Sequence, residues 1–189
     1  MIRYRYTIEY KEDFNEVIVD LGIDSSLKNG YLISNSLGSD IFGDLATIQE
    51  EIGNLIELLK GKITLYEGGG NVNLIKSDKS FTTFEDIFAE EDEEDSTCEI
   101  ETLEYVKILL LWAKENFQYK SQRGVILKEE AELALEWVDE KYIEVFVFGQ
   151  KIERINNRYV IFCLERCNFS FLKSYYSIVN SEKRVRFND

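Results

Sequence analysis

A long stretch of negative charge divides this chain. Eleven carboxylates lie between Glu85 and Glu104, and no lysine or arginine interrupts them. The 189 residues include 36 acidic and 22 basic side chains, a net charge of −14, and without this stretch the balance is 25 to 22. Six consecutive acids, Glu90–Asp95, repel one another and disfavour regular structure. We therefore expect an acidic, flexible segment at about residues 85–101.

The rest of the chain has the composition of a folded domain. Hydrophobic residues make up 44% of the sequence, enough to fill the core of one domain of this length. We predict a single α+β domain over residues 1–189, with a mainly antiparallel sheet and about three helices packed against it. The longest apolar run, Ile108–Ala113, is too short to cross a bilayer, so no membrane association is expected. Three cysteines and the lack of a signal peptide favour a reduced, cytoplasmic protein.

Periodicity predicts the secondary structure. Residues 2–10 alternate strictly, which predicts a strand with its tyrosines in the core and Arg3 and Arg5 in solvent. Further strands are expected at 17–19, 31–33, 62–66, 72–75, 142–148 and 158–164, with a turn at Gly68–Asn71. Helical spacing predicts helices at 44–61, capped by Asp44, at 102–117, capped by Thr102, and at 127–141. The tail from Phe169 fits a helix or a strand.

Several kinds of chemistry are excluded or disfavoured. The chain has no histidine, which excludes catalytic triads and metal sites that depend on it. The glycines 68–70 precede a strand-like segment and not a helix, so they predict a hairpin turn and not a phosphate loop. The acidic stretch lacks the spacing of a calcium loop, so no specific metal or cofactor is expected. Cys163 and Cys167 are expected to be buried structural thiols. The net charge argues against binding to nucleic acid.

The acidic stretch and its neighbours are the candidate partner-binding residues. Carboxylates there would speed association with a basic protein, and exposed aromatic groups would supply an apolar anchor. The candidates are Glu85, Asp86, Glu90, Glu91, Asp92, Glu93, Glu94, Asp95, Phe84 and Phe88. Two alternatives stay open: the acids form only a solvated loop, or the phenylalanines belong to the core. A helix bearing Glu129, Glu130, Glu132 and Glu136 offers a second acidic face.

These properties favour a stoichiometric binding module that neutralises a basic partner, such as a toxin or a nuclease. Small size, acidic balance and the lack of a catalytic constellation make the chain similar to bacterial immunity proteins and antitoxins, which cover cationic sites by electrostatic complementarity. One alternative is a non-catalytic adaptor or scaffold whose acidic loop keeps it in solution. A second is a hydrolase that uses aspartate and glutamate without histidine.

Overall fold

The computed structural model describes residues 2–13, 16–90, 96–149, 154–155 and 158–159. The chain divides into two compact units, Met1–Gln150 and Lys151–Asp189. In the second unit the described residues form one antiparallel pair, β7 (Arg154–Ile155) with β8 (Arg158–Tyr159). The strand predicted at 158–164 is confirmed at its first two residues. The rest of it, Cys163, Cys167 and the tail from Phe169 lie outside the described residues.

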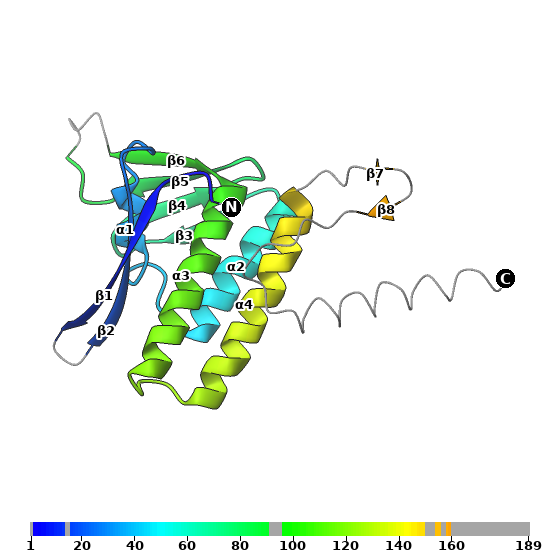
Figure 1. Cartoon of the computed structure of the whole chain (residues 1–189). Helices are drawn as coiled ribbons and strands as arrows, with labels where there is room; N and C mark the ends of the chain where they lie inside the picture. The colour runs from blue at the N-terminus through cyan, green and yellow to red at the C-terminus, as the bar shows by residue number, and fades with distance from the viewer. Residues whose placement is uncertain (1, 14–15, 91–95, 150–153, 156–157, 160–189) are drawn as a thin grey trace, which may run out of the picture. The chain divides into compact units, whose positions relative to one another are not determined.

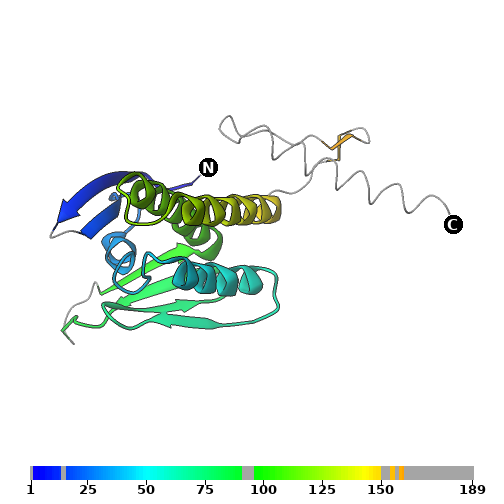
Figure 2. The same ribbon diagram turned by 90° about the horizontal axis from the view of Figure 1, so that it is seen from below.

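The first unit is an α+β fold, as predicted (Figure 1). Its helices are α1 (Tyr31–Ser36), α2 (Leu45–Leu59), α3 (Thr102–Gln122) and α4 (Lys128–Gly149). Its strands are β1 (Tyr6–Asp13), β2 (Glu16–Ile23), β3 (Tyr66–Gly69), β4 (Asn73–Ser77), β5 (Phe81–Asp86) and β6 (Thr97–Glu101). β1 and β2 form a hairpin of their own, whereas β3 to β6 form an antiparallel sheet in sequence order. Figure 2 shows this sheet as one layer, with the helices on one side of it.

Helix α3 is at the centre of the unit. It contacts β5 and β6 of the sheet, β2 of the hairpin, and both long helices, α2 and α4. The indole of Trp112 donates a hydrogen bond to the carbonyl oxygen of Val19 at 2.9 Å, which fixes the hairpin on this helix. In its apolar run from Ile108 to Ala113 every residue except the half-buried Leu111 is buried, so the apolar face of this helix is wide.

The helices predicted at 44–61 and 102–117 are confirmed. Asp44 caps α2, because its carboxylate accepts a hydrogen bond from the backbone N–H of Thr47 at 3.0 Å. The predicted role of Thr102 is wrong, since Thr102 is the first helical residue and its hydroxyl donates to the carbonyl oxygen of Asp78 at 2.7 Å. This bond ties the start of α3 to the β4–β5 turn.

Two predicted strands are helical. Residues 31–33 begin α1, in which Leu32, Ile33 and Ser36 are buried on one face. Residues 142–148 continue α4, because Val138 and Val145 lie seven residues apart and are both buried. The β-branched and aromatic residues of this segment favour a strand locally, and packing against α3 overrides that preference.

The first predicted strand begins at Tyr6, and its tyrosines are not in the core. Tyr6 and Tyr10 are 42% and 50% exposed, because β1 is the outer strand of the hairpin. Tyr10 stacks on Tyr119 of α3 with ring centroids 4.9 Å apart, and its hydroxyl donates to Glu115. That hydrogen bond to the carboxylate, together with burial, raises the pKa of Tyr10 to about 12. β1 thus rests on α3 through polar aromatic contacts.

The acidic segment predicted at 85–101 is ordered at both ends. β5 extends to Asp86 and β6 begins at Thr97, so carboxylates of this segment belong to the sheet. Regular structure therefore extends further into both ends of this segment than expected. Residues 91–95 lie outside the described residues.

The hairpin between β3 and β4 is held by a carboxylate from another loop. Oδ1 of Asp40 accepts the backbone N–H groups of Asn71 at 2.7 Å and Val72 at 3.0 Å. Its Oδ2 accepts that of Asn73 at 3.2 Å and the hydroxyl of Ser36 at 2.9 Å. Three backbone N–H groups of this hairpin, which would otherwise need hydrogen bonds to water, are thus satisfied by one side chain. The predicted turn at 68–71 begins two residues later, since Gly68 and Gly69 belong to β3.

We expect Gly69→Ala to destabilise the protein by about 2–4 kcal/mol. Gly69 has a φ of +78°, and a Cβ there would lie 2.2 Å from the carbonyl oxygen of Asn73. Gly53→Ala is the control, because Gly53 lies inside α2 with open space around its Cα. That change should stabilise by about 0.5–1 kcal/mol. Urea unfolding of both variants measures the difference, and equal effects would contradict this account of the turn.

Candidate docking surface

One face of the four-stranded sheet is open. Side chains alternate along each strand between a buried face, which the helices cover, and an exposed face. β4, for example, buries Asn73, Ile75 and Ser77 and exposes Leu74 and Lys76. Within residues 2–90 and 96–149, the structure places no element over the exposed face, as Figure 2 shows. We call the side chains exposed there the open face.

The strand register brings three carboxylates onto the open face. Glu67 of β3 lies opposite Lys76 of β4, and Thr83 of β5 lies opposite Glu99 of β6. Glu85 lies two residues along β5 from Thr83, so it is a diagonal neighbour of both Lys76 and Glu99. All three glutamates are exposed, and none of them makes an ion pair with the residues that the structure describes.

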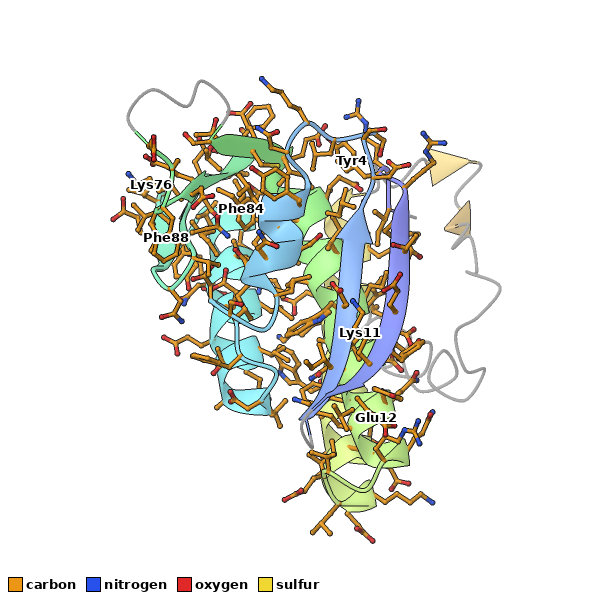
Figure 3. The ribbon with its side chains drawn as sticks, turned by 90° about the vertical axis from the view of Figure 1, so that its left-hand side faces the viewer. Tyr4, Lys11, Glu12, Lys76, Phe84 and Phe88 are labelled. Carbon is orange, nitrogen blue, oxygen red and sulfur yellow. The ribbon has the colours of Figure 1, made fainter. Side chains whose placement is uncertain are left out.

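Apolar side chains accompany these charges. Leu74 lies opposite Glu85 and is 41% exposed, and Phe81 at the other end of β5 is 45% exposed. Beyond the end of β5, Phe88 is 73% exposed (Figure 3). Large apolar groups that stay in water are unfavourable unless a partner covers them. The open face and the turn after β5 thus combine the two features that a protein-docking surface needs.

The structure separates the predicted contact residues into two groups. Glu85, Phe88 and Glu90 are exposed near one another at the end of β5, whereas Asp86 is half-buried and caps the turn by accepting the N–H of Phe88 at 2.8 Å. Phe84 is fully buried between the sheet and α1 and packs edge-on against Tyr105, with centroids 5.0 Å apart. It belongs to the core and offers no docking area. Glu91, Asp92, Glu93, Glu94 and Asp95 lie outside the described residues.

Two acids at the end of the acidic stretch are neutralised by the rest of the fold. Glu101 forms an ion pair with Arg3 and accepts the Tyr4 hydroxyl at 2.6 Å. Glu104 accepts the backbone N–H of Arg3 at 2.7 Å and pairs with Lys107 at 2.6 Å. The hydrogen bond from Tyr4 and the charge of Arg3 hold the pKa of Glu101 below its usual range. Among the described acids of this stretch, Glu85 and Glu99 make no ion pair with described residues, in contrast to Glu101 and Glu104.

Sequence reasoning missed Glu67, Leu74 and Lys76 as members of this surface. They are far from the acidic stretch in sequence, and only the register of β3 and β4 brings them to it. No alternation of apolar and polar residues marks them, because 73–77 reads Asn-Leu-Ile-Lys-Ser and the strand buries Asn73 and Ser77 while it exposes Leu74.

Other chemistry is limited among the residues that the structure describes. No three Cys, Asp or Glu side chains gather there in a way that could hold a metal ion. Burial raises the pKa of the Cys98 thiol to about 11, so it remains protonated at neutral pH and is a poor nucleophile. No described helix has the length and apolar content to cross a bilayer. The hydrolase alternative requires converging carboxylates open to a substrate, and it stays a prediction.

Comparison of the chain with protein-family models, with curated proteins and with solved structures found no match.

We expect Tyr4→Phe to destabilise the protein by about 1 kcal/mol at pH 7. Glu101 has a lowered pKa in the folded state, so the stability that it contributes is present above the usual pKa of glutamate and is lost as the pH falls through the lowered value. The effect of Tyr4→Phe should shrink accordingly between pH 5 and pH 3. Tyr6→Phe is the control, because the Tyr6 hydroxyl has no partner among the described residues. Urea unfolding at several pH values measures both, and a constant difference would contradict the role of Glu101.

Proposed function

We propose that this chain is a stoichiometric protein-binding module that neutralises a basic partner, with the open face as its docking surface. The observation that carries the proposal is the grouping of Glu67, Glu85 and Glu99 with the exposed Leu74 and Phe81 on one unpartnered sheet face. A bacterial toxin with a cationic active site, such as a nuclease, is the class of partner that fits. An immunity or antitoxin role in the cytoplasm follows as part of the same proposal.

The charge of the first unit supports a basic partner. Residues 1–150 contain 32 acidic and 14 basic side chains, a net charge of −18 for that unit. A field of this sign attracts cationic proteins and raises their association rate, while it repels nucleic acid. Association should therefore be fast at low salt and slow as salt screens the charges.

The shape of the surface supports a protein over a small molecule. The open face is formed by side chains that project from four neighbouring strands, and its charges lie in rows across the sheet. A surface of this kind suits a protein partner. Apolar anchors would then determine the lifetime of the complex, and the surrounding charges would determine the association rate. Within this proposal, Leu74 and Phe88 are the anchors.

α4 presents a second acidic surface, and it provides a matched control. Glu129, Glu136 and Glu140 are exposed there and make no ion pair with the described residues, as for the three glutamates of the open face. Ion pairs do occur on this helix at Lys128–Glu132 and Lys114–Asp139, so its charge is partly compensated. This compensation favours the open face as the docking surface.

The first test removes three charges from each surface in turn. Partner protein is captured from lysate of the native host at low salt, eluted with salt and purified for kinetics. We expect E67Q/E85Q/E99Q to lower its association rate constant about tenfold or more at low salt, with a smaller loss at high salt. E129Q/E136Q/E140Q carries the same charge change and should bind nearly as the unmodified chain does. Equal losses in both variants, or none in the first, would contradict docking at the open face.

The second test separates anchoring from attraction. We expect Phe88→Ala to raise the dissociation rate constant about tenfold, or about 1–2 kcal/mol, and to leave the association rate nearly unchanged. Phe42→Ala is the control, because Phe42 is 52% exposed in the loop before α2 and lies outside the open face. Surface plasmon resonance measures both rate constants. A normal lifetime for the Phe88→Ala complex would remove Phe88 from the interface.

A further inference from the structure

A buried carboxyl group connects the edge of the sheet to the helices. Glu51 of α2 is 5% exposed and lies on the covered side of the sheet. It accepts hydrogen bonds from the Tyr66 hydroxyl of β3 at 2.5 Å and from the Tyr105 hydroxyl of α3 at 3.4 Å. One side chain thus joins three elements of the first unit, and β3 contributes to it through a single residue.

No positive charge compensates this carboxyl group. Glu51 makes no ion pair within the part of the chain that the structure describes. The charged groups that act on it are acidic, Glu50 on its own helix and Asp40 in the loop that holds the β3–β4 turn. Desolvation by burial raises the pKa of Glu51, and the two tyrosine donors offset this only in part. An ionised Glu51 is therefore costly in the closed structure.

β3 is the element that ionisation of Glu51 should affect most. It is a four-residue edge strand, it contains two glycines, and it pairs with β4 alone. The Tyr66 side chain lies along the strand, where its hydroxyl would be 3.1 Å from a Cβ at Gly68, and it covers Glu51 from the sheet side. An opening of β3 would remove this cover and admit water to Glu51. Ionisation of Glu51 should therefore favour the open form.

We propose that Glu51 is a proton-controlled clasp for β3. The neutral carboxyl stays buried beneath Tyr66 at little cost and lets the edge strand stay closed against α2 and α3. Loss of the proton strengthens the hydrogen bond from Tyr66 but leaves an uncompensated charge buried, and this second effect favours opening of β3. The proposal is independent of the partner and of docking at the open face. Its direction follows from linkage: between the ordinary pKa of glutamate and the raised value, the equilibrium constant for opening increases up to about tenfold for each pH unit.

Hydrogen exchange on the full chain tests the clasp. Amide exchange in peptides that cover β3 is measured by mass spectrometry at pH 5 and pH 8 and corrected for the pH dependence of the intrinsic rate. Peptides from the core of α3 serve as the internal reference. We expect protection of β3 in the unmodified chain to fall about tenfold or more between pH 5 and pH 8, and protection of the α3 core to fall by no larger factor, because global unfolding exposes Glu51 as well. Unchanged protection of β3 would overturn the proposal.

Two variants and one spectroscopic measurement assign the effect to Glu51. Glu51→Gln keeps a neutral acceptor for Tyr66, so protection of β3 should be the same at both pH values. Glu50→Gln removes a charge from the exposed neighbouring residue and should retain most of the pH dependence, because burial is the largest cause of the raised pKa of Glu51. A fall in protection for Glu51→Gln equal to that of the unmodified chain would overturn the proposal. The side-chain carboxyl carbon of Glu51, followed by NMR in the unmodified chain, should titrate above the usual range, and titration at the ordinary value would overturn it too.

Discussion

The structure of the first unit depends on the wide apolar face of α3, which several elements bury together. The sheet, the hairpin, α2 and α4 each contact this helix, and what they leave is a partly exposed stripe that includes Glu104, Lys107, Lys114 and Gln118. Tyr105, Ile108, Leu109 and Trp112 repeat at the spacing i, i+3, i+4, i+7 along one side of the helix, and each is 2% exposed or less. None of these partners could bury an apolar face without α3, so their packing is mutually dependent. The breadth of this buried face lets one helix contact both the β1–β2 hairpin and the four-stranded sheet.

This arrangement leaves the four-stranded sheet with helices on one side only. An antiparallel sheet tolerates water on its other face when the residues there are polar, and this sheet meets that condition with glutamate. The same alternation puts Phe84 in the core and Glu85 in solvent, one residue apart. A chain selected only for solubility would not need Leu74 and Phe81 on the wet face. Their exposure beside uncompensated charge is the reason for assigning binding to this surface.

The helices could be predicted from the sequence better than the strands. Ile48, Ile52 and Leu55 repeat at helical spacing, which predicted α2, and the apolar run of α3 was equally clear. Residues 142–148 were misassigned because their preference is local, whereas the packing that decides their structure comes from α3, more than twenty residues earlier. The acidic half of the open face could be predicted in part, from Glu85 and Phe88. Glu67 and Leu74 could not, since their place depends on the register of β3 with β4 and of β4 with β5.

Glu51 shows how a polar residue can be hidden in an apolar pattern. It follows Ile48 by three residues and precedes Leu55 by four, so it falls within the apolar stripe of α2. Because the sequence contains 36 acidic residues, Glu51 does not stand out among them, although its helical spacing with Ile48 and Leu55 predicts that it is buried. A buried carboxyl without a cation lowers stability, and an apolar residue there would pack without that cost. What Glu51 adds is a hydrogen bond to the one side chain of β3 that reaches the helices. The edge of the sheet is thereby held through a group whose charge depends on pH.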